Sequence, residues 1–255
     1  MNYEENPKSI KYHVKKYLHK NKRRFQNKSF IDFPAGNGIT TKILREIGAK
    51  PFAFDLFPEY FNIEGLNCKR ANIVEGLPVK DAFADYLICQ EGMEHFSDQL
   101  ASFKEFNRVL KKGGGLIVTT PNYSSLRAKM SYFLSESERF NSIIAPNELD
   151  SIWMSNGDIT NEVYYGHIFL IGILKLRCLG KLSGFKIKHI QSTQVKTTSL
   201  FLLILFYPFI LLSNWITYKK RLRNNKDFDD HIKREVYNEI FKLAINPKIL
   251  VDGHI

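Results

Sequence analysis

Short apolar runs alternate with segments of helical periodicity through the middle of the chain. Runs of five or six residues, typical of buried strands, lie at 29–33, 51–55, 68–73, 85–89 and 116–120. Helix-periodic segments lie between them at 40–47 and 98–110, with a short aromatic helix expected from Pro58. This alternation predicts βαβ units. We therefore expect an α/β fold: a Rossmann-like, doubly wound, mostly parallel sheet with helices on both faces.

Residues 1–28 form a separate N-terminal segment in this scheme. Ile10, Val14, Tyr17 and Leu18 share one face at helical spacing, and lysines occupy most of the remaining surface. The pattern predicts a basic amphipathic helix. Two interpretations stay open: packing on the domain with a solvated basic face, or contact with acidic lipid or phosphate.

The central domain is expected to span residues 29–195. Residues 122–166 have no clear period and interrupt the alternation, so we interpret them as an insertion that forms a lid or substrate wall. A helix over 168–182 and a half-exposed strand over 184–190 complete the domain.

Residues 196–255 begin with an uncharged apolar stretch. Residues 197–218 carry no charge and lie between Lys196 and the basic cluster at 219–223. This length is close to what a bilayer requires, and Trp215 and Tyr218 resemble interfacial anchors. Three interpretations compete: a helix or hairpin embedded in one leaflet, a buried core element, and a spanning helix. One more helix is expected around 228–244.

Composition narrows the class of protein. The chain has 255 residues, of which 44% are hydrophobic and 25% charged, as in ordinary globular domains. Its formal net charge of +11 suggests a polyanionic neighbour such as a membrane surface, a phosphorylated substrate or nucleic acid. Three widely spaced cysteines without a CxxC argue against a disulfide framework or a metal site. No secretory signal is visible, which indicates a cytoplasmic location.

The strongest chemical signal is a strand, a loop of small residues and a helix around residues 30–41. Ala35, Gly36 and Gly38 allow close approach of a ligand to the backbone, and the following helix start favours a negative group. Asp55 ends the next strand, where a carboxylate can accept both hydroxyls of a ribose. An alternative role for Asp55 is to cap the short helix at Pro58.

Four segments in order over residues 28–121 resemble a class I S-adenosylmethionine-dependent methyltransferase. They are Asp32-Phe-Pro-Ala-Gly-Asn-Gly, Asp55, the stretch from Asn72 to His95, and residues 106–122. Pro34 stands where the family has its first loop glycine, and Asn72 where it has an acidic residue. The resemblance implies S-adenosylmethionine as cofactor, and it implies cofactor contacts for Asp32, Ala35, Gly36, Asn37, Gly38, Asp55, Leu56, Asn72, Ile73, Gln90 and Glu91.

Methyl transfer to a hydroxyl benefits from a general base. His95 and His167 are the two candidates, each with a packing or hinge role as its alternative. We expect an acceptor hydroxyl on a small or membrane-linked molecule, such as a sugar or lipid-linked intermediate, near the inner face of the membrane. The charge of +11 also motivates an RNA methyltransferase, although no RNA-binding module is visible. Pro34 and Asn72 motivate a third hypothesis, a cofactor-binding protein without activity.

Overall fold

The computed structural model describes residues 3–135, 152–153, 164–166, 168–193, 195–224 and 248–255. The chain divides into two compact units. The first comprises Met1–Pro121, Pro146–Thr193 and Lys248–Ile255, and the second comprises Asn122–Ala145 and Gln194–Pro247. The predicted helix around 228–244 and the candidate base His167 lie outside the described residues.

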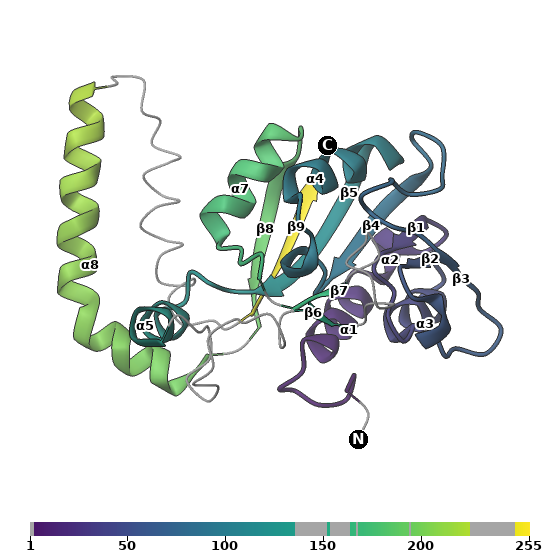
Figure 1. Ribbon diagram of the computed structural model, residues 1–255, viewed down its shortest axis with the longest axis horizontal. Coiled ribbons are helices and arrows are strands. Elements are labelled where there is room, and N and C mark those ends of the chain that lie inside the picture. The colour runs from purple at the N-terminus through teal and green to yellow at the C-terminus, as the bar shows by residue number, and fades with distance from the viewer. Residues whose placement is uncertain (1–2, 136–151, 154–163, 167, 194, 225–247) are drawn as a thin grey trace. The chain divides into compact units, whose positions relative to one another are not determined.

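A seven-stranded sheet forms the first unit (Figure 1). Its order is β3-β2-β1-β4-β5-β9-β8, and all neighbouring pairs are parallel except those that β9 makes with β5 and β8. The strands are β1 (Ser29–Asp32), β2 (Lys50–Asp55), β3 (Cys68–Arg70), β4 (Ala84–Gln90), β5 (Leu110–Pro121), β8 (Lys186–Ser192) and β9 (Lys248–His254). The predicted α/β class and mostly parallel sheet are confirmed.

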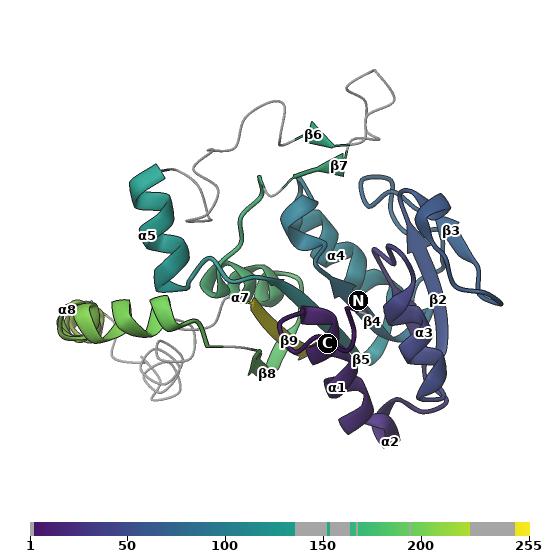
Figure 2. The same ribbon diagram turned by 90° about the horizontal axis from the view of Figure 1, so that it is seen from below.

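Helices cover both faces of this sheet (Figure 2). The helices of this unit are α1 (Ile10–Lys20), α2 (Lys22–Phe25), α3 (Ile39–Glu46), α4 (Gln99–Val109) and α7 (Ile173–Leu182), with 3-10 turns η1 (Pro58–Tyr60) and η2 (Met93–His95). Ser9 caps α1 by accepting the Lys11 N–H at 3.2 Å, and Asp98 caps α4 by accepting the Ala101 N–H at 2.8 Å. The pair β6 (Ile152–Trp153) and β7 (Tyr164–Tyr165) forms a separate two-stranded sheet.

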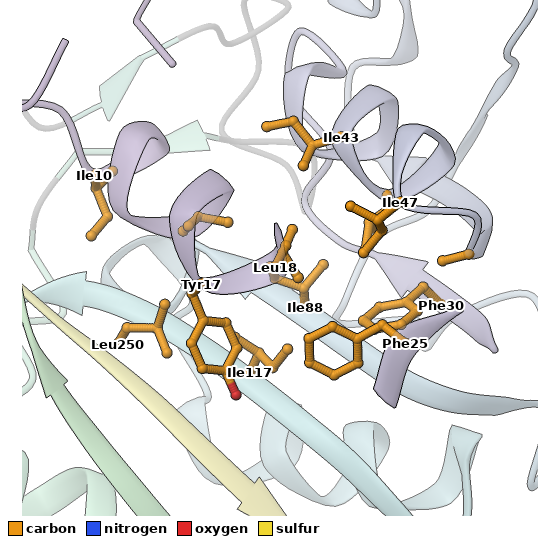
Figure 3. Packing of buried hydrophobic residues seen from close by; sticks show 13 residues of the cluster. Ile10, Tyr17, Leu18, Phe25, Phe30, Ile43, Ile47, Ile88, Ile117 and Leu250 are labelled. Carbon is orange, nitrogen blue, oxygen red and sulfur yellow. The ribbon is translucent and has the colours of Figure 1, made fainter. Parts of the chain in front are cut away.

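The N-terminal helix is part of this core. Figure 3 shows the side chains of α1 packed with residues of α2, α3 and the sheet. The buried cluster consists of Ile10, Val14, Tyr17, Leu18, Phe25, Phe30, Ile43, Leu44, Ile47, Ala49, Ile88, Ile117 and Leu250. Of the two interpretations of this basic helix, the structure shows packing on the domain, because the apolar face of α1 is buried in the same core as β1 and β4.

The last described strand corrects a predicted boundary. Residues 248–254 were expected in an apolar and basic tail, but they form β9, which lies between β5 and β8. A buried polar network fixes this strand to the N-terminal helices. The Asp252 carboxylate accepts hydrogen bonds from both Nη atoms of Arg24, at 2.7 and 3.2 Å, and from the Tyr17 hydroxyl, at 2.8 Å. Paired and hydrogen-bonded in this way, the Asp252 carboxylate is satisfied although almost no solvent reaches it.

The described part of the second unit contains the helices α5 (Leu126–Ser135) and α8 (Thr197–Asn224), which pack against each other. Figures 1 and 2 show α5 beside the first turns of α8, and Figure 1 shows α8 as a long bent helix. Pro208 lies inside it, where a missing N–H interrupts the helical hydrogen bonding.

Candidate functional site

The loop after β1 is held in a conformation that favours glycine at two positions. Gly36 and Gly38 have φ of 52° and 85°. A Cβ on Gly38 would lie 2.6 Å from side-chain atoms of Phe61 and Ile63, so packing excludes any larger residue there. A Cβ on Gly36 would meet nothing within 4 Å, because Gly36 borders an open cavity. The backbone at Gly36 is therefore accessible to a ligand.

Asp55 connects this loop to the end of β2. Its Oδ2 accepts the Gly36 N–H at 2.7 Å, and its Oδ1 accepts the Phe57 N–H at 2.9 Å. A carboxylate has about four lone-pair sites, so each oxygen retains capacity for a ligand hydroxyl. Asp55 thus combines a turn-capping role, which the sequence offered as its alternative, with a position on the cavity wall.

Asp32 lies beneath the loop and is fully buried. The Thr41 hydroxyl donates to its Oδ2 at 2.5 Å, and its Oδ1 has no hydrogen-bond partner among the described residues. Burial raises the pKa of the Asp32 carboxyl to about 7, the nearby charge of Asp55 adds to this rise, and the bond from Thr41 opposes it. Asp32 does not line the cavity, so its influence on a ligand is electrostatic.

Lys11 is one of the cavity residues that the sequence did not indicate as part of the site. Its Nζ donates to Asn37 Oδ1 at 2.9 Å, directly over the glycine loop. Burial lowers the pKa of Lys11, whereas the negative charges of Glu4, Asp32 and Glu91 act to raise it. The sequence marks Lys11 only weakly as a site residue, because its one distinguishing feature is that it follows the buried Ile10 at the edge of the apolar face of α1. Only the packing of α1 on α3 places this amine at the cavity.

A cavity of about 850 Å³ opens at the carboxyl ends of β1, β2 and β4. This volume is within the range of small-molecule and cofactor sites. Ten of the predicted site residues line it: Ala35, Gly36, Asn37, Asp55, Leu56, Asn72, Ile73, Gln90, Glu91 and His95. The structure brings these residues together, as the position at the end of parallel strands predicts. Asp32 and Gly38 are not among the residues that line the cavity.

Two of these residues have their polar groups engaged. Asn72 Oδ1 accepts the Val74 N–H at 3.1 Å, so part of its accepting capacity serves a turn. Gln90 Oε1 accepts a hydrogen bond from the Thr40 hydroxyl at 2.7 Å.

Glu91 has a positive φ of 51° and donates its N–H to the Thr119 carbonyl at 2.9 Å. Such a conformation is unfavourable for a non-glycine residue and is often found at functional sites.

His95 ends the turn η2 and is 9% exposed, on the cavity wall beside Phe96. The preceding Glu94 is fully buried, and its Oε2 accepts the Thr120 hydroxyl at 3.0 Å. The Phe169 N–H donates to the Glu94 carbonyl at 3.3 Å, which fixes the turn from the other side. His95 is therefore held in place at the cavity. No group of three or more His, Cys, Asp or Glu that could hold a metal ion occurs among the residues that the structure describes.

Comparison with known proteins agrees with this geometry. The family model of the methyltransferase domain matches residues 7–190. A ubiquinone biosynthesis O-methyltransferase from Xanthomonas oryzae pv. oryzae is 24% identical over 157 residues, which cover 54% of this chain and 65% of the relative. The chain thus matches less than two thirds of the length of this curated relative.

Solved structures share the fold. A SAM-dependent methyltransferase from Archaeoglobus fulgidus superposes with a TM-score of 0.56 at 13% identity, over 99% of this chain and 98% of that one. An S-adenosylmethionine-dependent methyltransferase from Mesorhizobium loti superposes with a TM-score of 0.54 at 10% identity, over the whole of both chains.

Proposed function

The chain belongs to the methyltransferase-domain family and uses S-adenosylmethionine; from this premise we propose that it methylates a hydroxyl oxygen on a small or lipid-linked acceptor. The observation that carries this proposal is His95, a buried imidazole fixed on the wall of the cofactor cavity. The O-methyltransferase function of the curated relatives supports the same choice of atom.

The residues present fit the cofactor. Gly36 leaves room against the backbone, because a Cβ there would meet nothing within 4 Å, and Asp55 lies on the wall of the same cavity. Asp55 would accept the ribose hydroxyls, and Leu56 and Ile73 would contact the adenine. Lys11 would pair with the cofactor carboxylate, since its amine lies at the loop that borders the cavity.

When bound, S-adenosylmethionine supplies a methyl group already activated by the sulfonium. The protein then contributes alignment and proton removal. A neutral hydroxyl is a poor nucleophile, and an imidazole on the wall can accept its proton as the oxygen attacks. The backbone carbonyl and side chain of Glu94 hold the turn that carries His95 at the cavity wall.

The test separates cofactor binding from methyl transfer. The full chain is incubated with tritiated S-adenosylmethionine and three acceptor pools: soluble phenols, sugars, and a bacterial lipid extract. We expect label in an O-methyl product of one of these pools. His95→Gln should retain the calorimetric affinity for S-adenosylhomocysteine but lose about 100-fold or more in transfer rate. His189→Gln, at an exposed position on β8, is the matched control and should keep wild-type activity.

Three outcomes would contradict the proposal. Label in total RNA but in none of the three pools would favour an RNA acceptor, to which the charge of +11 also points. Wild-type transfer rates in His95→Gln would remove the assigned base. Failure of His95→Gln to bind S-adenosylhomocysteine would place His95 in the cofactor site instead.

A further inference from the structure

Helix α8 exposes an unusually large apolar surface. The most apolar 18-residue window of Thr197–Lys220 has a mean hydropathy of 2.0, and 11% of this window is buried. Ten large side chains between residues 200 and 216 have exposed fractions from 38% to 72%: Leu200, Phe201, Ile204, Leu205, Tyr207, Phe209, Leu211, Leu212, Trp215 and Ile216. At roughly 200 Å² for a fully exposed large side chain, they present about 1,000 Å², more than a typical monomer leaves in one patch.

In the described part of α8, the buried and partly buried side chains follow one stripe. Ser199, Leu202 and Leu203 are buried, and Phe206, Ile210, Asn214 and Tyr218 continue the same stripe with partial burial. Their spacing of three or four residues defines one helix face, and α5 packs against α8. Among the residues that the structure describes, the ten large apolar side chains on the rest of the helix remain exposed. This exposure does not fit the interpretation of the segment as a buried core element.

The charges at the helix ends specify the partner. Between residues 196 and 224 no acidic residue occurs, whereas Lys196 precedes the apolar stretch and Lys219, Lys220, Arg221 and Arg223 follow it. Lys219 Nζ lies 4.0 Å from the centre of the Trp215 ring. Apolar residues bounded by tryptophan and basic residues are complementary to a bilayer with anionic headgroups.

The strand order then decides between spanning and embedding. The chain enters α8 from β8 and returns to β9, and these two strands pair with each other in the sheet. If α8 crossed the bilayer once, the connection between α8 and β9 would have to cross it a second time, because β9 pairs with β8 on the original side. Residues 225–247 contain nine charged residues, Lys226, Asp227, Asp229, Asp230, Lys233, Arg234, Glu235, Glu239 and Lys242. Charged residues are strongly disfavoured in the hydrocarbon core, so this segment cannot make the second crossing.

We propose that α8 is a monotopic anchor: it inserts into one leaflet of an anionic bilayer, and both of its ends remain on the side of the methyltransferase domain. The first turns of α8 pack on α5, and lipid covers the exposed apolar side chains of the helix. The anchor does not depend on the identity of the acceptor. It places the enzyme on a membrane surface whether its substrate is soluble or lipid-linked.

The first experiment tests binding and its chemistry. The full chain is floated with vesicles of phosphatidylcholine and phosphatidylglycerol at 3:1, and with vesicles of phosphatidylcholine alone. Wild type should bind the anionic vesicles more strongly and stay bound at high salt, because salt screens the charges but not the apolar contact. A triple variant with F201S, I204S and F209S should lose about 100-fold in partitioning. The variant L174S with L182S removes two exposed leucines of α7 and should bind like wild type.

The second experiment tests the topology. Lys196→Cys and Lys220→Cys are made separately in a background with Cys68→Ser and Cys178→Ser, which removes the partly exposed and the exposed native thiols and leaves the buried Cys89. On vesicle-bound protein, a membrane-impermeant maleimide added outside should label both positions. Labelling of only one position would establish a spanning helix and overturn the proposal. Wild type that ignores both vesicle types and instead self-associates through α8 would also overturn it, since a second copy would then cover the apolar surface.

Discussion

Asp55 offers the sharpest test of the cofactor site, because one substitution changes charge without changing size. In the wild-type protein its two oxygens accept the N–H groups of Gly36 and Phe57, at 2.7 and 2.9 Å. The lone pairs that remain would accept two ribose hydroxyls. Asp55→Asn keeps the side-chain volume but removes the negative charge, and it turns one acceptor into an NH₂ donor.

The size of the effect follows from these contacts. Hydrogen bonds to a charged group contribute about 1.5–3 kcal/mol and neutral ones about 0.5–1.5, so two ribose bonds lose roughly 2–3 kcal/mol in Asp55→Asn. This corresponds to an affinity about 30–150-fold lower at about 1.4 kcal/mol per decade. The new NH₂ group also faces a backbone N–H. The unpaired donor should lower the free energy of unfolding by about 1–3 kcal/mol.

Titration calorimetry with S-adenosylhomocysteine measures the affinity, and urea unfolding measures the stability. Asp81→Asn is the matched control: Asp81 pairs with Arg108 at the surface, and its side chain is 81% exposed. That variant should bind within about twofold of wild type. A folded Asp55→Asn that binds with wild-type affinity would refute the ribose assignment. An equal loss in Asp81→Asn would reveal a general effect of charge.

Three further predictions concern groups around the site and the core. The folded-state pKa of Asp32 is raised to about 7 from 3.8, so its protonated form stabilises the fold at low pH, and this contribution is lost as pH rises from about 4 to 7. In Asp32→Asn, the fall in the free energy of unfolding over this pH range should be smaller by up to about 4 kcal/mol, as measured by urea unfolding. Parallel pH curves of wild type and variant would contradict this prediction. Lys11→Met should weaken S-adenosylhomocysteine binding about tenfold in calorimetry, whereas the exposed Lys16→Met should not. Asp252→Asn should lower the free energy of unfolding by about 2–4 kcal/mol, since the partly buried Arg24 loses its bidentate partner; an unchanged thermal midpoint would contradict the network's role.

Local pattern predicted the part of the fold that is built from consecutive elements. The runs at 29–33, 51–55 and 85–89 became β1, β2 and β4, because buried strands of a parallel sheet are apolar throughout. The segment 116–120 lies within β5, which extends back to Leu110 through three glycines. The predicted strand at 68–73 is shorter, since β3 is an edge strand that ends at Arg70.

Long-range contacts explain what pattern did not predict. β9 is a seven-residue segment whose strand character depends on pairing with β5 and β8, which are distant in sequence. The position of Lys11 at the cavity depends likewise on how α1 packs. α5 lies in the segment without a clear period, and it packs against α8 within the second unit. Most of the predicted cofactor residues line one cavity because each ends a strand or follows it, where sheet topology determines the neighbours, whereas Asp32 and Gly38 do not line it.

The place of β9 in the sheet also constrains the order of events during synthesis. α8 precedes β9 along the chain, and β8 is joined to β5 only through β9. A growing chain therefore presents its apolar helix to the surroundings before the sheet has its seventh strand. A nearby membrane that takes up α8 at this stage would remove an aggregation-prone surface while the domain is still incomplete. Insertion before closure of the sheet is then the safer route to the native protein.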